Sequence, residues 1–454
     1  MTIKSNHVVV SFFIFTVSTF FVQAEEQMHH SKHYGFDESS PVQKHKMKQH
    51  GHDKSNPVQQ HKMKQHNGGH ISHAGGHMGH GMVNPESKKF PSTGYSETKK
   101  IRPIERPTLP HMKGDPVKGK VLAYAQSKGR CLACHVMGAD GSQAGDVGPN
   151  LSTYSKLGRT KAYTFQQIMD ARAHNPKTVM PPFGTNDILS KHEVMHIMAY
   201  LETLKTAVAA SVKPKRQERN FFVAGDDFSG ADTYVEQGEV IFTKQAKNGK
   251  SCSTCHSIKK SKKNSLKGIA ASYPKYDSHS KNIIGLEQRI NICQKKYKDS
   301  KPYRLGSKPS NTLMSYVKFL SRNTIIKIAT TNVNADAIKR GKASFYQKAG
   351  QLNFSCADCH TSVSGKWLRG QPLAAIEPNG KYSRTAATWP RHFIAGHDLG
   401  LISLRQRIRH CQTVTRTNPL KLHSQEYTDL ELYITTLANG KPMLAPTMSK
   451  LRGE

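Results

Sequence analysis

Hydrophobic residues are scarce in this chain. Only 36% of its 454 residues are hydrophobic, and the mean hydropathy is −0.61. This composition excludes a membrane protein with many spans, because each span needs about 20 consecutive, mostly apolar residues. One segment, Val8–Val22, could enter a bilayer; it follows Lys4 and ends at the small-residue cleavage site Val22-Gln23-Ala24. The pattern predicts a secretory signal peptide at residues 1–24, and a retained N-terminal anchor is the alternative.

Acidic residues are also few, with 32 Asp and Glu against 67 Lys and Arg and a formal net charge of +35. A surface of this sign attracts anions and acidic proteins. A basic surface that serves only solubility is the alternative. Because the predicted signal exports the chain, we expect no nucleic acid as a partner and no membrane span after cleavage.

Residues 25–82 hold 12 of the 25 histidines and include the related decapeptides Pro41–His50 and Pro57–His66. So few apolar residues cannot offset the entropy of ordering, which predicts disorder. Such a tract could bind Zn, Cu or Ni through neutral imidazoles or act as a solvated spacer. Residues 83–114 contain five prolines and are predicted to form an extended linker.

Strand-like runs are scarce after residue 115, where one helical pattern occurs three times. Each copy opens with a helix-like stretch that carries a glycine and closes with an apolar, aromatic-bearing helix. The opening stretches are Pro116–Ser127, Ala231–Ala246 and Ala335–Ala349, and the closing helices are Glu193–Leu204, Asn311–Leu320 and Glu426–Leu437. Asp115 followed by Pro116 is a typical helix start.

Six of the eight cysteines lie in Cys-x-x-Cys-His motifs, one in each copy. The motifs are Cys131/Cys134/His135, Cys252/Cys255/His256 and Cys356/Cys359/His360. This spacing is typical of c-type haem: two thiols add to the haem vinyl groups and the histidine binds the iron. Thiol–disulfide exchange or half of a zinc site would not need a histidine at the same place each time. The sequence therefore predicts three covalently attached haems c.

These motifs predict an all-α chain of three tandem cytochrome c-type modules behind the His-rich tract. The predicted domains are a signal peptide at 1–24, the His-rich region and linker at 25–114, and modules at 115–212, 213–328 and 329–454.

The remaining cysteines, Cys293 and Cys411, end matching octapeptides that begin at Leu286 and Leu404 and read L-x-Q-R-I-x-x-C. One follows each of the last two haem motifs. A Cys293–Cys411 disulfide is possible in an exported chain, but one ligand for each module explains the duplication. We expect both to be axial thiolates, which stabilise Fe(III) and lower the reduction potential.

The first module lacks such a cysteine but contains Gly148-Pro149 and the later segment Met180-Pro181-Pro182. In small cytochromes c the Gly-Pro loop places a carbonyl on the proximal histidine, and a Met-Pro turn supplies the second ligand. Four other methionines compete but lack a proline-flanked turn: Met137, Met169, Met195 and Met198. We therefore expect Met180 as the ligand. A neutral thioether raises the potential relative to a thiolate, so electrons should pass from the last two modules into the first.

Residues 115–445 resemble the sulfur-oxidation (Sox) cytochrome. The last two modules, each with a haem motif and a later cysteine, resemble its dihaem A subunit. The first, with Gly-Pro-Asn-Leu and Met-Pro-Pro-Phe-Gly, resembles its monohaem X subunit. The chain thus looks like a fusion of X and A, and the His-rich tract departs from the family pattern.

The resemblance implies a periplasmic enzyme that oxidatively joins thiosulfate to a cysteine of a carrier protein and passes two electrons to a cytochrome c. It implies that the haem bound by His360 and Cys411 is the active one, with Cys411 as a persulfide. It also implies that Arg407, four residues before Cys411, is an active-site group. A guanidinium suits the sulfonate end of thiosulfate, although Arg407 could instead pair with a haem propionate.

Three other functions remain open. A thiosulfate dehydrogenase would couple two thiosulfates to tetrathionate. A plain multihaem electron carrier would have no substrate. A metal-binding protein would use the His-rich tract, with the haems accessory.

Overall fold

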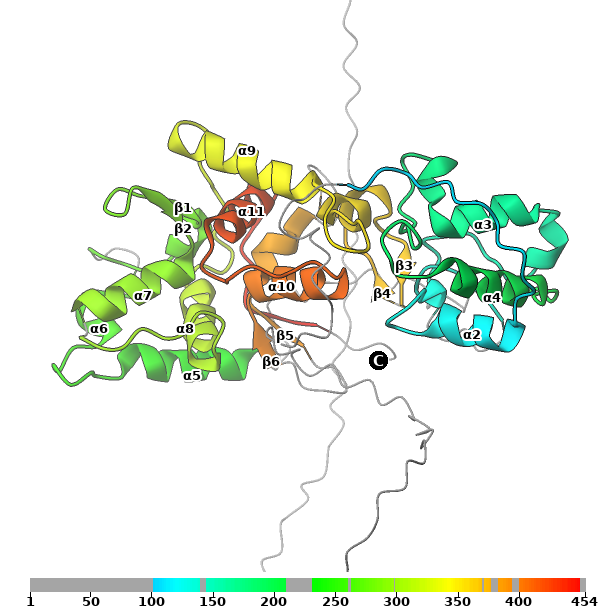
Figure 1. Cartoon of the computed structure of the whole chain (residues 1–454). Coiled ribbons are helices and arrows are strands. Elements are labelled where there is room, and N and C mark those ends of the chain that lie inside the picture. Colours follow the sequence, from blue (N-terminus) through cyan, green and yellow to red (C-terminus); the bar gives the residue numbers. More distant parts are fainter. Residues whose placement is uncertain are drawn as a thin grey trace, which may run out of the picture. The chain divides into compact units, whose positions relative to one another are not determined.

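The computed structural model describes residues 101–138, 144–209, 231–259, 263–297, 299–369, 371–376, 383–393 and 400–449 (Figure 1). All of them belong to one compact unit, Gly76–Glu454. The predicted signal peptide and the His-rich tract lie outside the described residues. Residues 101–114, the described part of the predicted linker, form neither helix nor strand.

Helices dominate the described residues, as the all-α prediction requires. The α-helices are α2 (Pro116–Tyr124), α3 (Lys161–Met169), α4 (Lys191–Glu202), α5 (Asp232–Thr243), α6 (Cys252–Cys255), α7 (Leu286–Tyr297), α8 (Lys308–Phe319), α9 (Val333–Tyr346), α10 (Leu404–Val414) and α11 (Gln425–Thr436). Short 3-10 turns are η1 (Cys131–Ala133), η2 (Tyr154–Leu157), η3 (Ala171–Ala173), η4 (Ile269–Ser272) and η6 (Ser383–Thr388), and η5 (Asp358–Ser362) is a π-type turn.

The strands are only two or three residues long. Two hairpins pair antiparallel: β1 (Lys275–Asp277) with β2 (Asn282–Ile284), and β3 (Trp367–Leu368) with β4 (Gln371–Pro372). A third sheet has the order β6 (Gly400–Ile402), β5 (Arg391–Phe393), β7 (Thr447–Ser449), with β5 antiparallel to β6 and parallel to β7.

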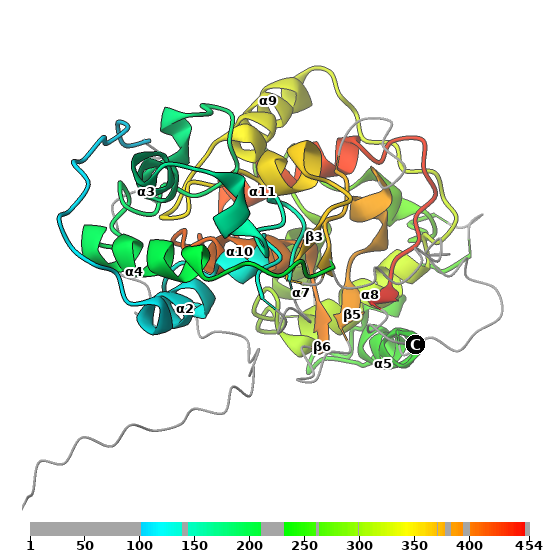
Figure 2. The same cartoon turned by 90° about the vertical axis from the view of Figure 1, so that its right-hand side faces the viewer.

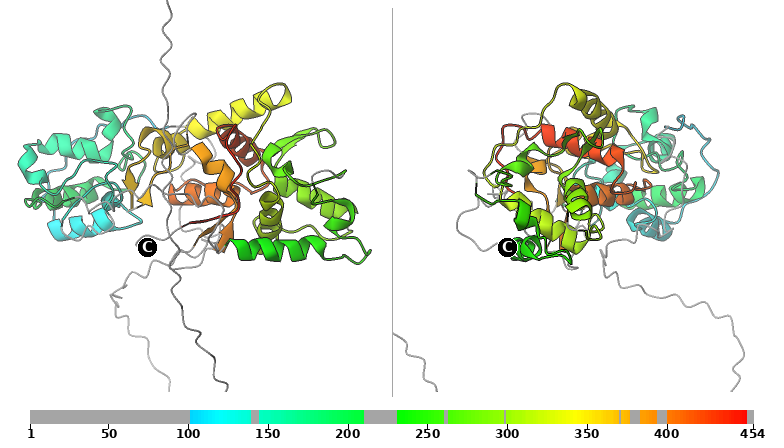
Figure 3. Two further views of the ribbon diagram at one scale, coloured as in Figure 1. Left: turned by 180° about the vertical axis from the view of Figure 1, so that it is seen from behind. Right: turned by 90° about the vertical axis from the view of Figure 1, so that its left-hand side faces the viewer.

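The opening and closing helices of each module cross in contact: α2 with α4 (Figure 2), α5 with α8 (Figure 3), and α9 with α11. A glycine stands at each crossing because the backbones approach too closely for a side chain. A Cβ at Gly119, Gly238 or Gly341 would lie 1.9, 2.5 or 2.0 Å from a carbonyl oxygen of the facing helix. The Cβ of a tyrosine on the facing helix would also lie within 2.9 Å in each case: Tyr200, Tyr316 and Tyr433. The same close crossing of two helices at a glycine therefore occurs in all three modules.

The predicted helices are present, and Asp115 caps α2 by accepting bonds from the amides of Val117 and Lys118. The opening helices end three residues earlier than predicted, at Tyr124, Thr243 and Tyr346. The physical reason is that each C-cap residue has extended backbone, with ψ of 128°, 122° and 122°. The chain therefore leaves the helix well before the haem motif.

The first module has its own core, built around Phe165, Val194 and Ile197. The second module has two small clusters, one around Met314 and one around Leu313. The largest cluster spans the last two modules, because Ile283 and Ile326 pack with residues of the third. The second and third modules therefore share a core.

Candidate active site and haem pockets

In the first module the Gly-Pro loop orients His135, the predicted iron ligand. The Nδ1 of His135 lies 2.8 Å from the carbonyl oxygen of Pro149, so Nδ1–H donates there and Nε2 is left for an iron. Gly148 lies against the ring, since a Cβ there would be 2.2 Å from Cε1 of His135. Burial lowers the pKa of His135, which favours the neutral imidazole that binds metal. The loop thus places a carbonyl on the histidine, as the Gly-Pro sequence predicted.

Met180 lies at the edge of the first core, partly buried. Its Sδ is 3.5 Å from Nε2 of Gln167, and its amide donates to Oγ1 of Thr178. The four competing methionines are all core residues with at most 7% exposure: Met137, Met169, Met195 and Met198. This arrangement is compatible with Met180 as the iron ligand, and that role stays a prediction.

A buried network that no sequence pattern predicted anchors the Met180 loop. Asp170 is fully buried and accepts bonds from Nη2 of Arg172 at 2.6 Å and from Oγ1 of Thr185 at 2.7 Å. Burial alone would raise the pKa of Asp170, but the bonds from Arg172 and Thr185 outweigh it and lower that pKa. The segment from Ala171 to Gly184 is thereby held at both ends. A buried Asp-x-Arg triplet has no motif that singles it out in a sequence.

The second module follows the same plan. The Nδ1 of His256 is 3.3 Å from the carbonyl oxygen of Asn264. Cys293 lies within α7, and its electrostatic interaction with Cys255 places it near the haem motif. Arg289, one turn earlier, pairs with Asp277 on β1 at 3.4 Å. Burial raises the pKa of the Cys293 thiol even though Arg289 lowers it.

In the third module His360 and Cys411 lie together. The Nδ1 of His360 is 2.7 Å from the carbonyl oxygen of Ala374, and Cys411 interacts by hydrogen bond with the same imidazole. Burial would raise the pKa of Cys411, but the charge of Arg407, the bond from His360 and the charge of Arg369 lower it to about 7. The structure thus groups the predicted residues of this site. It adds Arg369, which lies 42 positions before Cys411 and follows no recognisable motif.

None of the eight cysteines forms a disulfide in the structure, so the alternative Cys293–Cys411 disulfide is not formed. In the part of the chain that the structure describes, no group of three or more His, Cys, Asp or Glu residues could hold a metal ion. A haem iron needs only two protein ligands, and each module offers such a pair. The pairs are His135 with Met180, His256 with Cys293 and His360 with Cys411.

The residues fit haem groups in a second respect. Buried guanidinium nitrogens of Arg130, Arg369 and Arg409 have no hydrogen-bond partner among the described residues. Burial lowers the pKa of Arg130 to about 10, and the charges of Arg369 and Arg416 add to this effect. Buried donors need partners, and haem propionates would supply anionic oxygens. These guanidinium groups therefore suit haem propionates or other small anions.

Arg369 also lies where the first and third modules meet. The amide of Asp146 donates to the carbonyl of Trp367 at 2.9 Å, and the amide of Arg369 donates to the carbonyl of Ala133 at 3.0 Å. Asn186 and Gln351 exchange side chain–backbone bonds of 2.8 and 3.1 Å. Arg369 interacts electrostatically with both Cys134 and Cys359. The first module thus packs on the third module of its own chain, and their haem motifs are neighbours.

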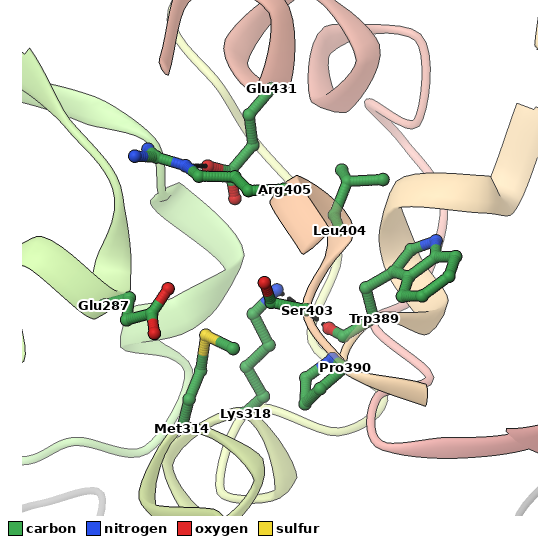
Figure 4. A pocket seen from close by; sticks show the side chains of 9 residues that line it. All are labelled: Glu287, Met314, Lys318, Trp389, Pro390, Ser403, Leu404, Arg405 and Glu431. Atoms are coloured by element: carbon green, nitrogen blue, oxygen red, sulfur yellow. Dashed lines mark hydrogen bonds and ion pairs between the residues drawn. The ribbon is translucent and has the colours of Figure 1, made fainter. Parts of the chain in front are cut away.

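A small pocket lies beside the first residues of the octapeptide helices of the last two modules (Figure 4). Arg405 donates to Oε2 of Glu431 at 2.6 Å and to Oε1 of Gln288 at 3.1 Å. Nζ of Lys318 donates to the carbonyl of Trp389 at 2.8 Å. The charged groups that line this pocket already have partners, and none of the predicted haem or active-site residues lines it. The pocket therefore belongs to the packing interface between the two modules.

Comparison with known proteins places these modules among cytochromes c. The family model SoxA/TsdA, cytochrome c domain, matches residues 237–326 and 340–443. The model Cytochrome C oxidase, cbb3-type, subunit III, matches residues 119–201. Cytochrome c domains carry covalently bound haem c, which agrees with the motifs. No described helix is long and apolar enough to cross a membrane.

The curated relatives each cover about half of this chain. The L-cysteine S-thiosulfotransferase subunit SoxA of Pseudaminobacter salicylatoxidans is 33% identical over 217 residues, covering 47% of this chain and 71% of the relative. The subunit of the same name from Chlorobaculum thiosulfatiphilum is 30% identical over 227 residues, covering 50% and 73%. The solved structure titled "Crystal structure of SoxXA from P. pantotrophus" covers 48% of this chain and 78% of its own, with 22% identity and a TM-score of 0.43.

Proposed function

This chain belongs to the SoxA family of L-cysteine S-thiosulfotransferase subunits, and we propose that it is a periplasmic trihaem cytochrome that conjugates thiosulfate to a cysteine of a carrier protein. In the reaction one S–S bond forms between the carrier sulfur and the outer sulfur of thiosulfate, while the S–H bond of the carrier thiol breaks and its proton passes to solvent. Two electrons leave to a cytochrome c. Each haem, when bound, supplies the redox chemistry for electron transfer. Each module would hold its haem through its own two cysteines and histidine.

The observation that carries the proposal is the positive environment of Cys411. Arg407 and Arg369 both interact electrostatically with its sulfur. Two guanidinium groups beside one sulfur suit a small dianion, because each offers a planar fork of donors to sulfonate oxygens. Cys411 and Arg407 would thus form the active site, with His360 and Cys411 as axial ligands. The way in which the site holds the outer sulfur of thiosulfate depends on the modification of Cys411, which the resemblance implies is a persulfide.

The packing of the first module supports the proposed electron order. The motif that contains Cys134 neighbours the motif that contains Cys359. Met180 as a neutral ligand would give the first haem a higher potential than the two thiolate-ligated haems. Electrons released at the third module would therefore pass to the first and then to an external cytochrome c. The second module, with His256 and Cys293 as ligands, would be a relay.

The family model describes SoxA and TsdA together, so a thiosulfate dehydrogenase that forms tetrathionate is the second candidate. Electron release from thiosulfate to cytochrome c should be measured with and without a carrier that bears a free arm cysteine. Turnover only with the carrier, with thiosulfonate mass on its cysteine, would support conjugation. Turnover without it, yielding tetrathionate, would establish the dehydrogenase. Absence of any turnover with thiosulfate would leave a plain electron carrier.

The role of Cys411 has a matched control. Cys411→Ala should retain three haems, counted by mass, but lose turnover. Cys293→Ala, the same change in the duplicated helix, should retain measurable turnover. Normal turnover in the Cys411 variant would contradict the catalytic assignment.

A further inference from the structure

The second and third modules share a hairpin that precedes each octapeptide. In β1–β2 the pairs are Lys275 with Ile284 and Asp277 with Asn282. In β5–β6 they are Arg391 with Ile402 and Phe393 with Gly400. Ile284 and Ile402 each stand two residues before the first residue of an octapeptide. A cis proline follows an aromatic residue just before each first strand, at Tyr273-Pro274 and Trp389-Pro390. The paired strands of the two hairpins therefore correspond residue by residue.

Within the paired strands this correspondence shows one carboxylate that the third module lacks; the octapeptides differ in charge as well, with Glu287 against Arg405 and Asn291 against Arg409. Lys275 of the second module corresponds to Arg391 of the third, and Arg289 corresponds to Arg407, so the basic positions are kept. Asp277 corresponds to Phe393, which carries no charge. At this position of the hairpin the second module alone has a carboxylate.

The carboxylate of Asp277 is held against the basic groups. Its Oδ1 lies 3.4 Å from Nη1 of Arg289, and its Oδ2 accepts the amide of Ser280 at 2.8 Å. The side chain of Asp277 is 14% exposed and that of Arg289 is 39% exposed. Lys275 interacts electrostatically with both of them. Asp277 thus occupies the place where an anion would bridge Arg289 and Lys275.

We propose that Asp277 is a specificity-determining residue that closes the second module to thiosulfate and thereby confines substrate to the third. A dianion that approached Arg289 would meet a carboxylate of the same sign that already occupies the guanidinium. Like charges close together oppose binding. Without the carboxylate of Asp277, the cations of Arg289 and Lys275 would attract a sulfonate. This inference rests on the proposed function only for the identity of the anion. It makes Arg289 a retained but blocked anion-binding residue.

The test uses the full haem-loaded chain and measures binding. Arg407→Ala first weakens the proposed site in the third module by removing one of its two guanidinium groups, which lowers the background binding. Asp277→Phe, which copies the third module, and Asp277→Asn, which removes only the charge, are each added to it. Binding of radiolabelled thiosulfate is measured by equilibrium dialysis, without carrier or electron acceptor. Haem absorbance and thermal unfolding check that each variant is folded.

We expect both Asp277 variants to bind thiosulfate at least about tenfold more tightly than the Arg407→Ala parent, which corresponds to about 1.4 kcal/mol. Adding Arg289→Ala should abolish the gain. Equal binding by the parent and both folded Asp277 variants would overturn the proposal, and so would a gain that survives Arg289→Ala. Failure of conjugation would be seen separately, in the carrier assay on the unmodified chain.

Discussion

The three glycines at the helix crossings predict a ranking of stabilities. Each of Gly119, Gly238 and Gly341 is replaced by Ala. Ordinary contact with a Cβ begins at 3.4 Å, whereas the nearest carbonyl oxygens would lie at 1.9, 2.5 and 2.0 Å. Because these atoms belong to the backbone of the facing helix, the helices must move apart. Gly119→Ala and Gly341→Ala require a displacement near 1.5 Å, and Gly238→Ala requires less.

The magnitude follows from two opposing terms. Overpacking of a close contact costs about 1–3 kcal/mol and occasionally more, and replacing a helical Gly by Ala returns about 1 kcal/mol. The net loss in the free energy of unfolding should therefore be about 2 kcal/mol for Gly119→Ala and Gly341→Ala. For Gly238→Ala it should be below about 1 kcal/mol.

Urea unfolding followed by far-UV circular dichroism and haem absorbance measures these losses. Val121→Ala and Val240→Ala are matched controls, since their side chains are 64% and 66% exposed on the same helices. Both controls should change the free energy of unfolding by less than about 0.5 kcal/mol. The reasoning is refuted if Gly238→Ala costs as much as Gly341→Ala, or if the controls cost as much as the crossings.

Three further predictions concern the first module and the His-rich tract. Met180→Ala should lower the potential of the first haem or make it high-spin, because a neutral thioether ligand is lost; an unchanged absorption spectrum would mean that another residue binds that iron. Asp170→Asn should cost about 3 kcal/mol at pH 7, since it leaves the buried Arg172 without its carboxylate. Because the folded pKa of Asp170 is lowered, its contribution is present above about pH 4 and is lost as the pH falls through the folded pKa. Urea unfolding should show a gap to wild type that is smaller at pH 3 than at pH 7, and an equal gap at both would contradict this. Deletion of residues 25–82 should leave haem content and thiosulfate turnover unchanged, and loss of either would give the tract a central role.

Packing between modules bears on how the chain works as one enzyme. The first module contacts the third through Asp146, Trp367 and the Asn186–Gln351 pair. Arg416 adds bonds to the carbonyls of Gln126 and Lys128. In a fusion of X-like and A-like parts, these contacts take the place of an interface between two chains. The covalent tether raises the effective concentration of one part for the other.

Short-range sequence patterns were enough to predict the haem motifs and the main helices of this protein. The haem motifs, the Asp115 cap and the paired octapeptides are short-range patterns, and each can be read without the fold because its residues act within a turn or two of chain. The six helices that frame the modules were predicted for the same reason, since each carries a run of apolar residues and the three opening helices also carry a glycine. The ends of the three opening helices were placed three residues too late, because the extended backbone at their caps has no residue signature.

Tertiary structure alone decided which charges meet. Arg369 reaches Cys411 from a hairpin 42 residues away in sequence, and Asp277 reaches Arg289 from a strand before the helix. Asp170 closes the Met180 loop through Thr185. The two octapeptides share five of their eight residues, yet burial and charge leave the thiol of Cys293 with a raised pKa and lower that of Cys411 to about 7. The electrostatic environment of a thiol is a sum over groups that folding brings together, so related motifs can acquire different chemistry.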